Sequence, residues 1–257
     1  MKKLYFFLVF SFIIFLVFFY YKKNTNDQKS EHNNELIVGI SADFPPFSSS
    51  DEGIYVGFDI DLTMLIAKEL KKDVTFKNMP FLSLLSTLQL QQITMVIASL
   101  TPTPERRQKV LFSENYIDSD SFVILSLAKN KKESLADLIG KKIIVNTGYS
   151  AEKYVDSLEI DYGFTIQKLK TLSDALFALK NGIADAFITA ESTVTRLFET
   201  ELRDVFCVAK IPGTTESSAI AFHKDQKELC DIVNNILKKF KEDGTIAFLK
   251  KKWNIAV

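Results

Sequence analysis

Short runs of β-forming residues alternate with amphipathic helical patterns from residue 36 to the end of the chain, and this alternation restricts the fold more than any other feature of the sequence. In the first helical pattern, Leu62, Leu65, Ile66 and Leu70 recur at the spacing that places them on one face of a helix. Such alternation favours a mostly parallel sheet with helices on both faces, because parallel strands need crossover connections. We therefore predict an α/β fold. Strands are expected at 36–40, 74–76, 95–98, 121–127, 142–146, 164–168, 185–189, 205–208 and 219–222. Helices are expected at 61–71, 81–91, 134–140, 151–158, 173–180, 225–242 and 245–253, and a further helix is expected to begin near residue 191.

The composition of the chain excludes some classes of function. The 257 residues are 47% hydrophobic and 25% charged, which is ordinary for one large domain or two small lobes. Basic and acidic residues both total 32, and no basic stripe is visible, so no nucleic-acid partner is expected. Two cysteines, Cys207 and Cys230, and two histidines, His32 and His223, lack the spacing of a metal site. We expect no metal, no cofactor and two packed or half-exposed thiols, although the thiols could form one bridge in an oxidising compartment.

The first 23 residues differ from the rest of the chain. An apolar run from Leu4 to Tyr21, interrupted only by Ser11, is flanked by pairs of lysines. Roughly 18 apolar residues are just enough to span the hydrocarbon core of a membrane. A secretory signal would have a shorter apolar stretch and small residues after it, so an uncleaved membrane anchor is favoured over a removed signal. Residues 24–34 are polar and rich in Asn, Lys and Gln, which is typical of a flexible tether.

The segment after the third predicted strand has the features of an anion site. Thr103 is placed as the N-cap of a helix, Pro104 takes its first position and Arg106 lies in its first turn. Free N–H groups at a helix start favour an anion, and a guanidinium adds a planar fork that suits a carboxylate. Ser99 and Thr101 would let backbone and hydroxyl groups approach a ligand closely. On this segment alone, Arg106 could also pair with a surface acid beside a routine helix start.

Two aromatic residues and a turn are further candidates. Phe44 lies in the segment 41–47, which we predict to be a loop because two successive prolines forbid both helix and central strand. This loop follows the carboxyl end of a strand, where open α/β sheets bind ligands. Phe44 and Phe81 could stack on a ligand side chain or could be ordinary core residues. The turn at residues 147–150 could donate N–H groups to a ligand or could be a plain helix cap.

No catalytic constellation stands out. The chain has no glycine loop of the nucleotide-binding kinds, no G-x-S-x-G and no H-E-x-x-H. Asp59 and Asp61 fall two residues apart at a helix start, so they do not face each other and are interpreted as capping charge. This weakens every enzyme hypothesis without excluding one.

Several motifs occur together and in order along the chain. They are the Pro-Pro-Phe that ends at Phe47, Gly-Phe-Asp-Ile-Asp-Leu at 57–62, the run at 101–106, the segment 135–142 and Asn-Gly-x-Ala-Asp-Ala at 181–186. With this combination the chain resembles the polar amino-acid-binding proteins of bacterial ABC transporters (bacterial extracellular solute-binding family 3). The resemblance covers residues 35–253. Its Gly-Phe-Asp-x-Asp-Leu and Thr-x-x-Arg motifs are specific together, and neither is specific alone.

The resemblance implies a two-lobed periplasmic-binding-protein fold of the type II kind. Each lobe would be a mostly parallel sheet flanked by helices, and the lobes would close over a ligand by bending at two crossover strands. Lobe 1 would comprise 35–120 and 218–257, lobe 2 would comprise 121–217, and the crossovers would lie near 121–127 and 217–222.

The resemblance also implies roles for individual residues. Arg106 would hold the α-carboxylate of the ligand, and Thr101 and Ser99 would bind the carboxylate and the α-amino group. Ser150 would add a contact to the carboxylate from lobe 2.

At the other end of the ligand, Phe44 and Phe81 would sandwich its side chain. Ser41 stands where members that bind cations commonly have an acid, and a second acid common in this loop is also missing. These departures disfavour arginine or lysine as the ligand, although Asp43 and Asp120 could compensate.

The α-ammonium group of the ligand poses a separate question. The family usually has an aspartate for this group at the end of the strand predicted at 185–189, but here that position is Ala190 and the acid Glu191 comes one residue later. Binding a cation without a paired acid would be costly. Either Glu191 serves through a shifted strand end, or recognition of the ammonium group is altered.

The main hypothesis is an extracytoplasmic solute-binding component of an ABC-type uptake system. It would bind a polar amino acid and deliver it unchanged to a membrane permease, as a monomer at the periplasmic or extracellular face of the cytoplasmic membrane. A second hypothesis is an enzyme, because the same family includes dehydratases that act on cyclohexadienyl carboxylic acids, and Glu191 would be the acid–base candidate. A third is a ligand-sensing domain, which is disfavoured because no signalling module follows residue 253.

Overall fold

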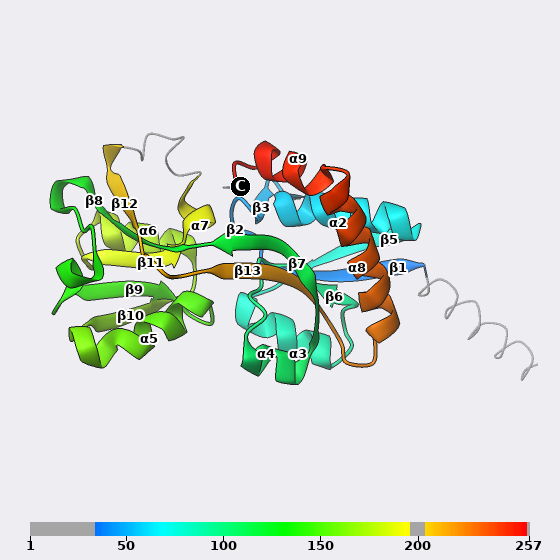
Figure 1. The fold of residues 1–257 in the computed structure, drawn as a ribbon, viewed down its shortest axis with the longest axis horizontal. Coiled ribbons are helices and arrows are strands. Elements are labelled where there is room, and N and C mark those ends of the chain that lie inside the picture. Colours follow the sequence, from blue (N-terminus) through cyan, green and yellow to red (C-terminus); the bar gives the residue numbers. More distant parts are fainter. Residues whose placement is uncertain (1–33, 196–203, 256–257) are drawn as a thin grey trace, which may run out of the picture.

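Two α/β lobes lie side by side and are connected by extended strands, as Figure 1 shows. The computed structural model describes residues 34–195 and 204–255. Each lobe is built on a five-stranded sheet, ordered β5-β1-β6-β13-β7 in the first lobe and β10-β9-β11-β8-β12 in the second. The α/β fold predicted from the alternation of strands and helices is therefore confirmed.

The first lobe carries helices on both faces of its sheet. Its strands are β1 (Glu35–Ile40), β5 (Asp73–Asn78), β6 (Met95–Val96), β7 (Leu111–Asp120) and β13 (Glu216–Phe222). Its helices are α2 (Phe58–Leu70), the 3-10 turn η1 (Phe81–Ser83), α3 (Leu84–Gln89), α4 (Pro104–Lys109), α8 (Lys227–Glu242) and α9 (Thr245–Lys252).

The second lobe repeats this plan. Its strands are β8 (Phe122–Leu127), β9 (Lys142–Asn146), β10 (Thr165–Leu169), β11 (Ala186–Ala190) and β12 (Phe206–Lys210). Its helices are η2 (Ala128–Asn130), η3 (Leu135–Leu138), α5 (Ser150–Tyr162), α6 (Leu172–Lys180) and α7 (Glu191–Thr195).

The sheets are mixed and not mostly parallel as the sequence predicts, because parallel pairing is confined to three strands of each sheet. The sets β5-β1-β6 and β10-β9-β11 pair in parallel, whereas β13 with β6 and β7, and β8 with β11 and β12, pair antiparallel. The antiparallel strands are the ones that lead from one lobe into the other: β7 runs on into β8, and β12 leads into β13 (Figure 1). A strand that enters a sheet from the other lobe needs no crossover helix, so its direction is not restricted to parallel.

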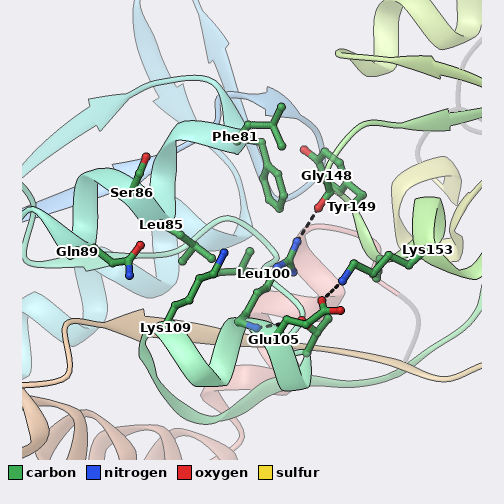
Figure 2. Close-up of a pocket in the computed structure, with 14 residues that line it drawn as sticks. Phe81, Leu85, Ser86, Gln89, Leu100, Glu105, Lys109, Gly148, Tyr149 and Lys153 are labelled. Atoms are coloured by element: carbon green, nitrogen blue, oxygen red, sulfur yellow. Dashed lines mark hydrogen bonds and ion pairs between the residues drawn. The ribbon is translucent and has the colours of Figure 1, made fainter.

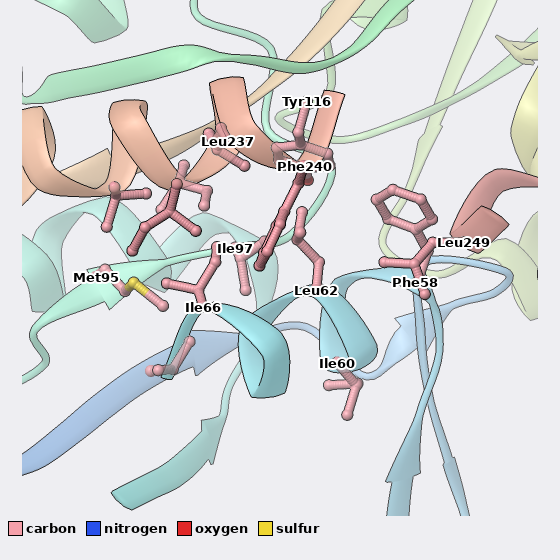
Figure 3. Close-up of a cluster of buried hydrophobic side chains, with 14 of the residues drawn as sticks. Phe58, Ile60, Leu62, Ile66, Met95, Ile97, Tyr116, Leu237, Phe240 and Leu249 are labelled. Carbon is pink, nitrogen blue, oxygen red and sulfur yellow. The ribbon is translucent and has the colours of Figure 1, made fainter. Parts of the chain in front are cut away.

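Successive strand residues point to opposite faces of the sheet, and each face has its own apolar core. In the first lobe, Met95 packs with α2, α8 and α9, whereas its neighbour Val96 packs with α3 on the other face. Figure 3 shows the first of these clusters, in which Leu62 and Ile66 of α2 face Leu237 of α8. In the second lobe, the same alternation divides neighbouring residues of β9 between the helices α5 and α6.

Several predicted boundaries differ from the structure. The helix predicted from residue 61 begins at Phe58, and the helix predicted over 81–91 is divided into η1 and α3. No strand was predicted at 111–120, where β7 lies. Its pairing with β13 contains register irregularities, so its polar and apolar residues do not alternate regularly and leave no period-2 signal.

The sequence predicts a loop for the whole proline-containing segment 41–47. The structure differs, because part of this segment forms a strand. A small antiparallel sheet contains β2 (Asp43–Phe44), β3 (Ser48–Asp51) and β4 (Ile54–Val56). The two prolines lie in the tight turn between β2 and β3, where the Phe47 N–H donates to the Phe44 carbonyl at 3.0 Å. The prolines therefore fall outside the ladder, which is why they do not prevent the pairing.

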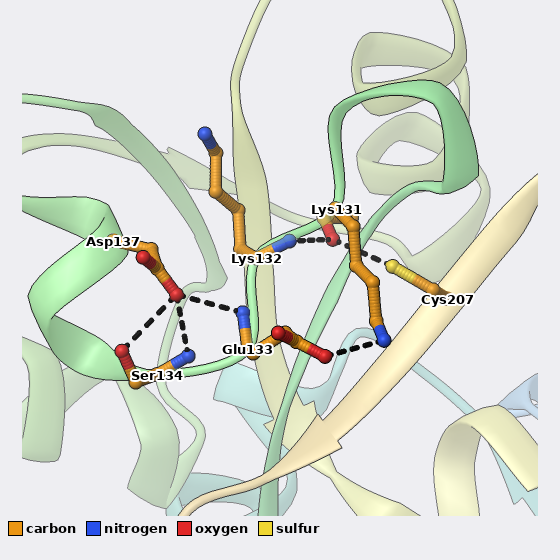
Figure 4. A network of polar contacts seen from close by, with 7 residues as sticks. Lys131, Lys132, Glu133, Ser134, Asp137 and Cys207 are labelled. Atoms are coloured by element: carbon orange, nitrogen blue, oxygen red, sulfur yellow. Dashed lines mark hydrogen bonds and ion pairs between the residues drawn. The ribbon is translucent and has the colours of Figure 1, made fainter.

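The cysteines lie in different lobes and are both free. Cys207 in β12 is half-buried, and its sulfur lies 3.0 Å from the Ser126 hydroxyl. Figure 4 shows this sulfur beside the loop in which the Asp137 carboxylate accepts the N–H and hydroxyl of Ser134. Cys230 is buried on α8. The interpretation as packed or half-exposed thiols is confirmed.

The anchor predicted at 1–23 lies outside the described residues, and so does the tether predicted at 24–34 apart from Asn34. Within residues 34–195 and 204–255, no helix has both the length and the apolar character needed to span a membrane.

We predict that Gly57→Ala destabilises the first lobe by at least about 2 kcal/mol, because its backbone and its surroundings both demand glycine. Its φ is 141°, and an added Cβ would lie 2.1 Å from the Phe47 carbonyl oxygen. The matched control is Gly163→Ala, with φ of 61° and open space around the Cβ, for which about 1 kcal/mol is expected. Urea unfolding measures both variants, and equal losses would contradict the steric argument.

Candidate functional site

The site begins with a buried carboxylate beneath a turn. Asp59 is fully buried, and it accepts the Ser99 N–H at 2.8 Å, while the Tyr116 hydroxyl accepts the same N–H at 3.1 Å. Ser99 has a φ of 45°, a conformation that costs a non-glycine residue about 1–3 kcal/mol and persists only where its surroundings impose it. Asp59 therefore holds the turn that leads to Thr101. Asp59 and Asp61 both lie in the first turn of α2, as their interpretation as capping charge predicts, but each carboxylate also has a partner elsewhere, and Asp61 accepts the Trp253 indole N–H at 2.7 Å.

Burial dominates the electrostatics of Asp59. It raises the pKa of this carboxyl to about 7, although hydrogen bonds from Tyr116 and Ser99 act in the opposite direction. Burial and the neighbouring Asp59 also raise the pKa of Tyr116 well above its ordinary value.

The helix start predicted at Thr103 is confirmed. The Thr103 hydroxyl accepts the Arg106 N–H at 3.3 Å, and Pro104 takes the first position of α4. The Arg106 side chain then extends toward the second lobe. One of its terminal nitrogens donates to the Thr101 carbonyl at 2.7 Å, and the other donates to the Gly148 carbonyl at 2.7 Å. Arg106 thus bridges the two lobes, and its described contacts include no surface acid.

The guanidinium of Arg106 is half-buried and remains charged at neutral pH. Burial lowers its pKa to about 10, and the negative charge of Glu216 acts in the opposite direction. The guanidinium also lies over the Phe81 ring, 5.4 Å from its centroid. A half-buried cation beside an aromatic face is suited to an anionic partner that approaches from the space between the lobes.

An aromatic residue of the second lobe lies between the two predicted aromatic residues of the first. The Tyr149 ring stacks on Phe81 at 4.0 Å and on Phe44 at 4.9 Å between centroids. Gly148 makes this close approach feasible, because an added Cβ there would lie 2.3 Å from a methyl carbon of Leu82. The turn at 147–150 therefore supplies both a carbonyl to Arg106 and a ring to the space between Phe44 and Phe81.

Three cavities lie along this contact between the lobes. The smallest, about 30 Å³, is lined by Phe44, Ser99, Thr101, Asp120, Phe122, Tyr149, Ser150, Ala151, Thr189, Ala190, Glu216 and Ser218. The cavity of Figure 2, about 290 Å³, is lined by residues that include Phe81, Arg106, Gly148, Tyr149 and Ser150. The third, about 540 Å³, lies beyond Phe81 and is lined by residues that include Ser41, Asp43 and Thr171.

Most of the predicted site residues lie around these cavities. Thr101 donates to Glu216 at 2.8 Å, and its hydroxyl lies 3.4 Å from that of Ser150 across the lobes. Ser41 is buried, and its hydroxyl donates to Asp43 at 2.8 Å.

Glu191 is the predicted site residue that the structure does not place at these cavities. Its carboxylate forms an ion pair with Lys210 at 2.8 Å, and it lines none of the three cavities described above. Ala190, at the expected position of the missing acid, does line the smallest cavity.

Two residues at the site were not among the predicted ones. The sequence predicts Tyr149 only as part of the turn at 147–150, and it gives no prediction for Glu216. A signal for Glu216 exists in the sequence, because it is the first residue of β13 and the rest of that strand is uncharged. No group of three or more His, Cys, Asp or Glu side chains that could hold a metal ion occurs among the described residues.

The sequence pattern of the bacterial extracellular solute-binding proteins, family 3, matches residues 36–256. The chain belongs to this family. The predicted resemblance is therefore confirmed, and the two lobes correspond to those of solved family members.

Individual relatives are similar over nearly the whole described part of the chain. The arginine-binding extracellular protein ArtP of Bacillus subtilis is 34% identical over 221 residues, which cover 85% of this chain and 86% of that protein. An ancestral arginine-binding protein solved with arginine is 35% identical, with a TM-score of 0.80 over 86% of this chain and 98% of that one. An ancestral amino acid-binding protein described as a precursor of cyclohexadienyl dehydratase is 32% identical, with a TM-score of 0.79 over 88% and 98%.

We predict that Asp59 makes stability fall with rising pH. Because its folded pKa of about 7 exceeds the ordinary value of 3.8, folding favours the protonated form. Its contribution is fully present below the ordinary value and is lost as the pH rises through 7. Relative to wild type, Asp59→Asn is expected to gain up to about 4 kcal/mol of unfolding free energy between about pH 4 and pH 8, because the amide keeps the acceptor without the charge. Urea unfolding across this range measures it, and parallel pH profiles would contradict it.

Proposed function

We propose that this chain is the extracytoplasmic solute-binding component of an ABC-type uptake system, and that it binds a polar α-amino acid between its lobes and delivers it unchanged to a membrane permease. The observation that carries this proposal is the Arg106 guanidinium, which is charged, half-buried and directed from the first lobe at the second. Membership of the solute-binding family supports the same function.

In this proposal the ligand carboxylate takes the place that the Gly148 carbonyl has at Arg106. A charged N–H donor binds an ionised carboxylate more strongly than it binds a neutral carbonyl oxygen. The hydroxyls of Thr101 and Ser150 lie next to each other on the two sides of this position, and the Ser99 turn forms its floor. A bound carboxylate would therefore receive donors from both lobes.

The side chain of the ligand would enter between Phe44 and Phe81. The Tyr149 ring fills this space, so a ligand must displace it. Beyond Phe81 the space continues into the cavity lined by Ser41 and Asp43, whose polar groups suit a polar side chain. Ser41 in place of an acid argues against a cationic ligand, whereas Asp43 and the arginine-binding relatives argue for one, so arginine stands among the candidates.

Binding would require the lobes to separate. A cavity of about 30 Å³ holds one or two water molecules and not an amino acid. The connections from β7 to β8 and from β12 to β13 are the segments about which the lobes could turn. We propose the same division as before: 35–120 and 218–257 move as one lobe and 121–217 as the other.

Residues 1–23 would anchor the chain in the cytoplasmic membrane, and 24–34 would tether the lobes to it as a monomer on the outer side. The apolar run and its flanking lysines support the anchor.

The first test is a thermal-shift screen of the full-length chain, in detergent micelles, against the twenty amino acids. A ligand at about a thousand times its Kd should add roughly 4 kcal/mol, a shift of around ten degrees for a chain of this size. Arg106→Ala should abolish the shift, because the carboxylate would lose its cation. Arg107→Ala is the matched control, since Arg107 is exposed and its guanidinium donates instead to the Pro102 carbonyl at 3.1 Å.

The absence of a shift with all twenty amino acids would contradict the proposal. The same screen extended to cyclohexadienyl carboxylic acids would then test the dehydratase, which the precursor relationship of one similar structure keeps as the second candidate.

A further inference from the structure

The smallest cavity between the lobes has an acidic side. Two carboxylates line it, Asp120 from β7 and Glu216 from β13. These residues are Cα partners on neighbouring antiparallel strands. Like charges directly opposite each other in a sheet are destabilising unless a cation or a proton intervenes. The acidic side therefore favours a cationic group in the cavity.

The two carboxylates differ in the hydrogen bonds that they already accept. Asp120 accepts both the N–H and the hydroxyl of Ser192, at the start of α7, and the N–H bond is 3.2 Å long. Burial raises the pKa of Asp120 above its ordinary value, which favours its neutral form. Glu216 is half-buried, and one of its oxygens accepts the Thr101 hydroxyl at 2.8 Å. Glu216 is therefore the better placed of the two to receive a further donor.

Glu216 also has a defined position relative to Arg106. The Thr101 carbonyl accepts from Arg106 at 2.7 Å, and the Thr101 hydroxyl donates to Glu216 at 2.8 Å. A cation and an anion thus lie on two sides of a single residue, and the negative charge of Glu216 acts to raise the pKa of Arg106 against the larger effect of burial. An α-amino acid carries a carboxylate and an ammonium on the same carbon, so its two charges match this arrangement.

We propose that Glu216 binds the α-ammonium group of the ligand while Arg106 binds its carboxylate. This inference rests on the proposed function, and it assigns to the hinge strand β13 the anion that Ala190 does not provide. Glu191 is the rival acid, but its carboxylate is paired with Lys210 at 2.8 Å. A ligand held in this way would contact a strand that connects the lobes, so recognition of the ammonium group would occur at the hinge itself.

The test compares two ligands on the same variants by isothermal titration with the full-length chain. One ligand is the amino acid with the largest thermal shift, and the other is its desamino analogue, which keeps the carboxylate and side chain but lacks the ammonium group. Glu216→Gln is expected to weaken the amino acid at least about 30-fold, since removing one charge of a buried pair costs 2 kcal/mol or more. The desamino analogue should change less than about threefold, because it makes no contact that depends on the charge.

Three further variants make the outcome decisive. Glu216→Asp keeps the charge and should recover part of the affinity, and Glu228→Gln, an exposed acid on α8, should leave both affinities unchanged. An equal loss of both ligands in Glu216→Gln would overturn the inference, because Glu216 would then act only by positioning Thr101. A selective loss in Glu191→Gln instead of Glu216→Gln would also overturn it.

Failure of the proposed function would look different from either result. In that case the wild-type chain would bind no amino acid at all, and the inference about Glu216 would fall with it. Thermal unfolding without ligand shows in parallel that each variant remains folded.

Discussion

A half-buried guanidinium needs acceptors for its donors, and Arg106 finds them in both lobes. One carbonyl comes from Thr101 in its own lobe and the other from Gly148 in the second lobe, each at 2.7 Å. The same turn that supplies the second carbonyl places the Tyr149 ring on Phe81. The chain thus offers its own carbonyl and ring where the proposal places a ligand carboxylate and side chain. A ligand must therefore compete with internal contacts, which lowers its net affinity by the free energy of those contacts.

The Gly-Phe-Asp motif acts beneath the site and not at it. Gly57 lets α2 begin against the Phe47 carbonyl, and this brings Asp59 under the Ser99 turn, where its carboxylate holds the backbone in a left-handed conformation. Removing this carboxylate from water raises its pKa to about 7. Such a group stabilises the turn at the expense of global stability at neutral pH, which is the usual relation between a binding site and the fold that supports it.

Much of the fold could be predicted from the sequence, because strand and helix periodicities are local. The helix start at Thr103 was predictable for the same reason, since an N-cap, a proline and an arginine lie within four residues. The strand β7 was not, because its irregular pairing with β13 depends on a partner about a hundred residues away. The side-chain directions of Glu191 and Glu216 could not be predicted from the sequence either. Which of them faces the cavity depends on Lys210 and Thr101, and both partners are remote in sequence.

The central claim is that an α-amino acid binds between the lobes with its two charges divided between Arg106 and Glu216. A crystal structure of the full-length chain with the amino acid that stabilises it most tests this directly. The account predicts the ligand carboxylate on the Arg106 guanidinium, the ammonium nitrogen within about 3 Å of a Glu216 oxygen, and the Tyr149 ring withdrawn from between Phe44 and Phe81. A ligand bound elsewhere, with Arg106 still on the Gly148 carbonyl and Tyr149 still in its place, would contradict it.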